Sequence, residues 1–316
     1  MLALYRAILA VSWRRQIPLI GLSLAVAALA AVPLSYQKAI VNGLGGAVAA
    51  QPDALERLYR NCAELAALIL LSLALKWAVG YLSGLTGENV IRVIRTRIHA
   101  LSFDAGRHRP EAPPEGALVT MISAEAEEVG RFVGGAFSTP LLQLGTLVSV
   151  IAFIAVSQPG LGALAAAVIL PQAVIVLLTQ RQVNRLVADR VHLLRRAAST
   201  LTAEDLAAIE AMPRDFDAIY ETRRRIFLWK LSTKFLLSAL NGAGMVGILL
   251  LGGALVIEGE TDVGTVVAAT LGLQRLQQPW TQLVAFYRDA SAVRVKFDLL
   301  RGAVPANRFG PPAAAP

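Results

Sequence analysis

The sequence has little charge and almost no cysteine. Charged residues make up 16% of its 316 residues and hydrophobic residues 55%, whereas an ordinary soluble domain carries about 25% charged residues. This composition argues against a soluble enzyme, and the chain is too apolar to be disordered. Cys62 is the one cysteine, so a disulfide scaffold within the chain is excluded.

Clusters of residues that carry metal or hydrolytic chemistry are also missing. The three histidines, His99, His108 and His192, are scattered and do not have the spacing of a zinc site. Ser83 and Ser102 have no plausible histidine and aspartate partners at membrane depth, which argues against a membrane hydrolase. The glutamates at 125, 127 and 128 are too close together for a two-carboxylate reaction centre. They are interpreted as a solvated helix face or as a patch that meets a basic partner.

What the sequence does contain is six long apolar runs. A helix needs about 20 apolar residues to cross the hydrocarbon core of a bilayer, and backbone groups facing lipid must be satisfied within the segment. Buried helices of a large soluble core would need polar helices to cover them, and none is left over. The runs predict an all-α membrane protein with spans at 16–37, 65–87, 132–157, 161–180, 235–257 and 263–287.

The basic residues predict which side each connection faces. Of the 30 Lys and Arg, 25 lie before span 1, between spans 2 and 3, between spans 4 and 5, or after span 6. The opposite connections hold only Lys38, Arg57 and Arg60. Cytoplasmic loops carry the excess of basic residues, so both termini are expected in the cytoplasm. The basic clusters are then expected to face anionic lipid headgroups rather than nucleic acid. Residues 2–15 are expected to form an interfacial helix that leads into span 1, not a cleaved signal peptide.

The two long cytoplasmic connections, 88–131 and 181–234, carry helical periodicity and no long Gly/Ser linker. The membrane helices are therefore expected to continue into the cytoplasm as paired rods. We expect the first pair to turn at Pro110, Pro113 and Pro114, and the second at Pro213. The glycines of span 5 are interpreted as permitting either close helix packing or bending of the helix; they are Gly242, Gly244, Gly247, Gly252 and Gly253.

Several motifs resemble the transmembrane domain of an ABC exporter of the six-helix, half-transporter type. The distinctive ones are residues 252–260, which read GGALVIEGE, residues 263–268, which read VGTVVA, and the segment from Arg275 to Leu300. Residues 101–104, LSFD, followed by 116–118, GAL, resemble the first cytoplasmic hairpin of that family. The resemblance covers residues 1–301. The Pro-rich segment 109–115 and Ala124, where the family commonly has Asp, depart from the family pattern.

The motor of such a transporter is absent from the sequence. There is no phosphate-binding loop, since no Gly-Lys pair occurs anywhere, and there is no ABC signature or hydrophobic run ending in Asp-Glu. Without such a loop ATP has no cradle for its phosphates. The chain is therefore expected not to be an enzyme, with ATP and Mg bound by a partner ATPase domain. It is interpreted as a separate membrane subunit or as a domain of a longer gene product, and 302–316 as a Pro/Ala-rich, disordered tail.

Two cations lie deep in the predicted spans. Lys76 is eleven residues into span 2 and Arg275 twelve into span 6, which puts both about 16–18 Å deep. A lipid-facing cation costs at least about 2.5 kcal/mol there. Lys76 and Arg275 are therefore expected to face a water-filled substrate cavity with Gln274 and Gln278, where they could meet an anionic cargo. The alternative is a structural role, either snorkelling or bonding to backbone carbonyls.

The resemblance implies a mechanism. Two such chains, or this chain and a related one, would form the substrate pathway of an exporter in a bacterial inner membrane. Two hairpins of each would dock on nucleotide-binding domains, with helices four and five crossing to the other subunit. The contact residues expected on the hairpin tips are Phe103, Asp104, Arg107, Met212, Pro213, Asp215 and Phe216. Two alternatives stay open. One is a degenerate domain acting as a scaffold or regulator. The other is an ion-driven transporter, which usually needs the intramembrane carboxylates that this sequence lacks.

Overall fold

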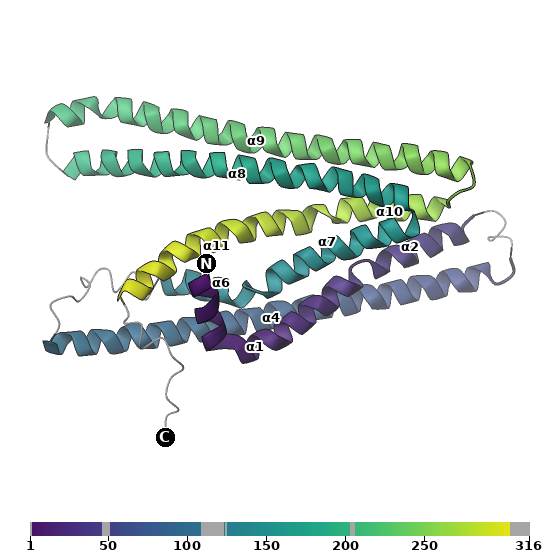
Figure 1. The fold of residues 1–316 in the computed structure, drawn as a ribbon, viewed down its shortest axis with the longest axis horizontal. Coiled ribbons are helices and arrows are strands. Elements are labelled where there is room, and N and C mark those ends of the chain that lie inside the picture. Colours follow the sequence, from purple (N-terminus) through teal and green to yellow (C-terminus); the bar gives the residue numbers. More distant parts are fainter. Residues whose placement is uncertain (1, 46–50, 109–122, 124, 203–205, 304–316) are drawn as a thin grey trace, which may run out of the picture. The chain divides into compact units, whose positions relative to one another are not determined.

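A computed structural model describes residues 2–45, 51–108, 123, 125–202 and 206–303. Every regular element in these ranges is helical, which confirms the all-α prediction. The helices (Figure 1) are α1 (Leu2–Leu29), α2 (Val32–Gly43), α4 (Ala54–His108), α6 (Ala126–Gly135), α7 (Ser138–Ser157), α8 (Pro159–Thr202), α9 (Leu206–Ile257), α10 (Val263–Arg275) and α11 (Gln277–Ala303).

Several helices are far longer than a bilayer requires. At 1.5 Å per residue, the 55-residue α4, the 44-residue α8 and the 52-residue α9 extend about 83, 66 and 78 Å. The hydrocarbon core is only about 30 Å thick. The apolar runs in these helices therefore continue as rods well beyond any membrane, as the sequence predicts.

Five helical stretches are long and apolar enough to cross a membrane in the part of the chain that the structure describes. They are Leu4–Gly43, Ala54–His99, Ala126–Ser157, Pro159–Leu194 and Pro213–Ile257. The sixth predicted span coincides with α10 and the first turns of α11, and its membrane crossing stays a prediction.

Three of the predicted spans are interrupted, and each interruption has a proline as its cause. Pro33, Pro140 and Pro279 lie in the first turns of α2, α7 and α11. A proline has no N–H, so the carbonyl four residues earlier loses its helical donor. Those carbonyls belong to Leu29, at the end of α1, to Ala136, which caps α6, and to Arg275, at the end of α10. The three helices therefore end at the residues whose carbonyls have no donor.

Residues Met1–Phe153 and Asp262–Pro316 form one compact unit, called unit 1. An apolar cluster joins α1, α4, α6 and α11 through Leu4, Ile8, Val90, Phe132 and Phe297. Residues 2–15 thus begin the 28-residue α1 and pack one face onto the unit. Trp13 on another face is 52% exposed. Figure 1 shows that the first turns of α1 run at a steep angle to the remainder.

Helices α4 and α6 of unit 1 approach each other through glycines. A Cβ on Gly134 would lie 2.3 Å from the Ser83 carbonyl oxygen, and one on Gly130 would lie 2.9 Å from the Gly87 carbonyl oxygen. Only glycine allows two helix backbones to pass this closely. This crossing fixes α6 against the middle of α4.

Residues Ile154–Thr261 form unit 2, which consists of α8 and α9 joined as a hairpin. The two helices run side by side along their length (Figure 1). Thr233 donates its hydroxyl to Thr179 Oγ1 at 3.0 Å, and Gln172 Nε2 lies 3.4 Å from Asn241 Oδ1.

Helix α8 ends at Thr202 and α9 begins at Leu206, so the second rod pair does not turn at Pro213 as expected. Pro213 is an internal residue of α9. A proline inside a helix leaves one carbonyl without its donor, and α9 continues through Pro213 as α8 continues through Pro171. Pro110, Pro113, Pro114 and Ala124 lie outside the described residues, as does the tail from 304 onward.

Candidate functional site

The interruption at Leu276 collects polar groups in the middle of the sixth predicted span. Gln274 and Gln278 are one helical turn apart and both exposed, while Arg275 is half-buried. No acidic side chain in the described ranges pairs with Arg275. The Arg275 carbonyl has no helical donor because of Pro279. Broken helices with free backbone groups occur at membrane depth where they line a cavity, so the predicted cavity residues of α10 and α11 form one polar patch.

Lys76 lies on a different helix from this patch. It is exposed on α4, beside Leu73, which is 56% exposed, and Trp77, which is 71% exposed. The ring of Trp77 stacks on Tyr81 with centroids 5.4 Å apart. Helix α2 packs against both α4 and α10, and no direct interaction joins Lys76 to Arg275. The two predicted cavity cations therefore lie apart in unit 1, with Lys76 exposed and Arg275 half-buried.

The predicted coupling residues lie at the far ends of the rods. Phe103, Asp104 and Arg107 belong to the last two turns of α4, but their side chains lie outside the description. On the second rod pair, Met212 and Pro213 lie near the start of α9. Pro213 is exposed, and the side chain of Met212 is likewise not described.

Two further residues follow on α9. Asp215 is half-buried and Phe216 is 54% exposed. An exposed phenylalanine at the end of a long helix is a suitable anchor for a docking partner.

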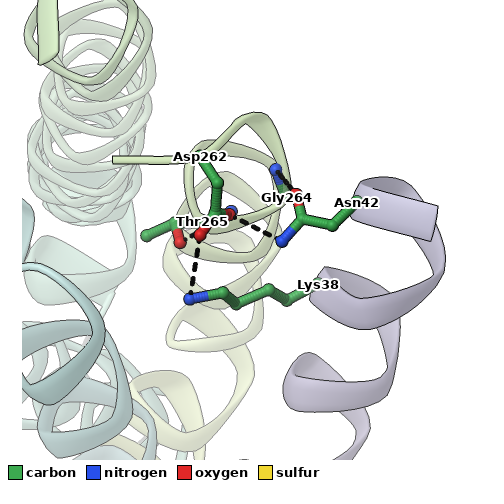
Figure 2. A network of polar contacts seen from close by, with 5 residues as sticks. All are labelled: Lys38, Asn42, Asp262, Gly264 and Thr265. Carbon is green, nitrogen blue, oxygen red and sulfur yellow. Dashed lines mark hydrogen bonds and ion pairs between the residues drawn. The ribbon is translucent and has the colours of Figure 1, made fainter. Parts of the chain in front are cut away.

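A polar network joins the end of α2 to the start of α10, both of which the sequence assigns to the outer side of the membrane (Figure 2). Asp262 caps α10: its Oδ1 accepts from the Thr265 N–H at 2.6 Å and from the Thr265 hydroxyl at 2.8 Å. From α2, Asn42 Nδ2 donates to the same oxygen at 2.9 Å, and Lys38 Nζ lies 3.3 Å from Oδ2. We call these four residues, with Gly264, the α2–α10 clasp.

Electrostatics favours a charged Asp262 in the clasp. Burial alone would raise the pKa of its carboxyl. The hydrogen bonds from Asn42 and Thr265, with Lys38 beside them, outweigh burial and hold the pKa below its usual value. The clasp also accounts for a cation on the side that the sequence assigns to the outside, because Lys38 is neutralised by Asp262. Arg57 is similarly paired with Asp53 at 2.9 Å.

Gly264 lets the two helices meet in the clasp. Its N–H donates to Asn42 Oδ1 at 2.8 Å. A Cβ at this position would lie 2.4 Å from the Lys38 carbonyl oxygen and 2.5 Å from Asn42 Oδ1. A side chain larger than hydrogen would therefore separate α2 from α10.

A pocket of about 420 Å³ opens between α6–α7 and α11 of unit 1. Its polar groups are Glu128, Arg131, Thr139, Gln282 and Asp289. One wall is aromatic, where Phe132 and Phe286 stack with centroids 5.4 Å apart and planes at 23°. Gly135, Ala285 and Ala292 provide the open space because their side chains are small or absent.

Most of the charges at this pocket are already paired. Glu128 forms an ion pair with Lys296. Arg131 bonds Glu127 at 2.8 Å. Asp289 is exposed and has no partner among the described residues. The glutamates 127 and 128 therefore meet basic groups of their own chain, and one uncompensated carboxylate remains.

Sequence reasoning missed the clasp and the pocket. The clasp has one local signal: Asp262 followed by Gly264-Thr265 is a typical helix N-cap pattern. Its partner Asn42 is 220 residues away, and nothing in the sequence pairs them. The pocket depends on the approach of α6 to α11, which no local pattern reveals.

The sequence matches the family described as ABC transporter transmembrane region over residues 18–280. That match covers most of the chain. The chain belongs to this family. Among curated proteins, none matches the sequence. The rods, the apolar helices and the family together establish an integral membrane protein with the fold of an ABC transmembrane domain. An ABC transmembrane domain implies a nucleotide-binding partner and a surrounding lipid bilayer.

Proposed function

We propose that the chain is the permease subunit of an ATP-driven exporter in a bacterial inner membrane, with both termini in the cytoplasm. Two copies, or this chain and a related one, form the pathway. Membership of the ABC transmembrane family is the observation that carries the proposal. The direction of transport follows the resemblance of residues 252–300 to exporters.

ATP hydrolysis is assigned to a partner domain, on another polypeptide or elsewhere in a longer one. The 316 residues contain no Gly-Lys pair and hence no phosphate-binding loop. The rods α4, α8 and α9 extend tens of ångströms past their apolar runs, so they reach toward such a partner. Closure of the ATPase domains would move the rod tips. That motion drives transport only if the two states bind ATP with different affinity.

The docking of the second tip can be tested with one substitution. Phe216→Ala removes an exposed aromatic ring and is expected to weaken binding of the ATPase domains about tenfold or more, because aromatic anchors dominate such interfaces. Tyr220→Ala is the matched control, since Tyr220 is 68% exposed one helical turn further along α9. Binding is measured by titrating the purified ATPase domains onto the chain in nanodiscs.

Equal binding by the two variants would remove Phe216 from the interface. Transport that continues after ATP is depleted, or the recovery of no ATPase partner when the chain is purified from its native membrane, would contradict the permease assignment. An intact ATPase assembly that moves no cargo would favour the scaffold or regulator.

The charge of the cargo is the subject of a second test. Lys76→Ala and Arg275→Ala are expected to reduce transport of an anionic cargo more than that of a neutral one, because each removes a cation from the pathway. Uptake into inverted vesicles that contain the complete transporter measures both. Equal losses for the two cargoes would assign Lys76 and Arg275 a structural role.

A further inference from the structure

The pocket between α6–α7 and α11 is joined to the predicted pathway by a polar stripe. Gln274, Gln278 and Gln282 follow one another at intervals of four residues, and all three are exposed. Asp289, seven residues further, continues the same helix face. Gln282 and Asp289 both line the pocket. The three glutamines lie within the sixth predicted span, where polar side chains are unfavourable against lipid, so this face is expected to border water.

The chemistry of the pocket has a definite sign. Lys296 neutralises Glu128 and Glu127 holds Arg131, so Asp289 is the pocket carboxylate left without a counter-ion among the described residues. The Gln282 amide and the Thr139 hydroxyl supply further oxygens. The Phe132–Phe286 pair supplies an apolar wall, and aromatic faces attract cations. Oxygen acceptors around one free negative charge, with aromatic rings beside them, match an organic ammonium group.

We propose that this pocket binds the positively charged group of an amphipathic cargo, with Asp289 as its counter-ion and the phenylalanine wall against its apolar body. The proposal rests on the function proposed above, because it deepens the substrate class of that permease. The pocket lies at the predicted cytoplasmic boundary of the membrane, where the third predicted span begins at Phe132 and the sixth ends in α11. A cargo entering from the predicted cytoplasmic side meets it first.

The site differs in sign from the deeper cations. Arg275 lies fourteen residues before Asp289, which follows the end of the sixth predicted span, and the two are about 21 Å apart along the helical segment. The pocket therefore selects the ammonium end of a cargo without contact with Arg275, and its preference is measured separately.

Binding to the full chain in nanodiscs, without any ATPase domain, tests the proposal. Three dansyl probes differ only in their end group: trimethylammonium, neutral amide or sulfonate. The cationic probe is expected to bind about tenfold more tightly than the amide, and the sulfonate more weakly than either. Asp289→Asn is expected to reduce the cationic preference to twofold or less. Asp189→Asn, which removes an exposed charge from α8 of unit 2, is expected to keep the preference.

A second variant tests the location. Ala285→Phe fills the pocket and is expected to weaken the binding of all three probes. An equal preference in the wild type and in Asp289→Asn would overturn the proposal, as would probe binding that Ala285→Phe leaves intact. Because no ATPase domain is present in this experiment, neither result decides whether the chain is a permease. A failure of ATPase docking would likewise not change the measured binding of the probes.

Discussion

Units 1 and 2 are built in different ways from the same apolar residues. Unit 2 consists of α8 and α9, two long helices that no interruption divides. Unit 1 has three interrupted segments, a glycine crossing, the α2–α10 clasp and the pocket. Side chains such as Phe235 and Leu250 of unit 2 are 75% exposed, so that unit offers long apolar faces to its surroundings. Unit 2 is thus a simple pair of rods, whereas the clasp, the glycine crossing and the pocket all lie within unit 1.

Glycines show the same contrast. In unit 1 Gly87, Gly130 and Gly134 lie against backbone atoms of the neighbouring helix. In unit 2 a Cβ on Gly247 would lie 3.1 Å from Leu164, but Gly242 and Gly253 have nothing within 4 Å. Of the two roles expected for the span 5 glycines, close packing is therefore wrong for Gly242 and Gly253. The presence of glycine in a helix permits close approach without requiring it.

The largest effect on stability is expected when alanine replaces a glycine packed against a neighbouring helix, compared with a glycine that has open space around it. Gly134→Ala places a methyl group against the Ser83 carbonyl and is expected to destabilise the chain by about 1–3 kcal/mol, since packed helices must separate. Gly253→Ala fills open space in unit 2 and is expected to stabilise α9 by about 0.5–1 kcal/mol, because alanine favours a helix over glycine. Thermal unfolding in detergent micelles measures both. Changes of the same sign would contradict the glycine comparison.

An intermediate effect is expected in the clasp. Asp262→Ala removes the N-cap of α10 and the acceptor for Asn42, so a loss of about 1–2 kcal/mol is expected from the same unfolding measurement. Asp53→Ala is the control: its ion pair with Arg57 is exposed and is worth less than about 1 kcal/mol. If the two losses were equal, the clasp would contribute no more than a surface ion pair.

The smallest effect concerns pH. The pKa of Asp262 is lowered in the folded chain, so its contribution is present above the unfolded value of about 3.9 and is lost as pH falls through the folded value. Because its side chain is 45% exposed, the contribution is expected to be below about 1 kcal/mol. Unfolding midpoints of wild type and Asp262→Asn, compared between pH 6 and pH 3, are expected to converge at low pH. Parallel curves would contradict this.

The sequence predicts the helical class and the rods well because both follow from local patterns. A run of about 20 apolar residues and its continuing helical periodicity need no knowledge of neighbours. The interruptions were readable in principle, since Pro33, Pro140 and Pro279 are visible in the sequence. Yet Pro171 and Pro213 leave α8 and α9 continuous. Proline alone therefore does not decide whether a helix ends.

The candidate site was predicted less completely, because it depends on partners distant in sequence. Gln274 and Gln278 are exposed and Arg275 is half-buried, and the cavity that they are expected to line stays a prediction. Lys76 is not joined to them, and helix depth alone could not reveal that. The free charge of Asp289 becomes apparent only once Lys296 is seen to pair with Glu128, across the contact of α6 with α11.

The three proline interruptions have a mechanical consequence. Each removes one backbone hydrogen bond at a single turn, so bending there costs less energy than elsewhere along the same segment. Helices α8 and α9 contain Pro171 and Pro213, but both helices continue through these prolines without a break. Bending within unit 1 is therefore expected to concentrate at Leu276, Ala136 and the Ala30–Ala31 step, where its helices are interrupted.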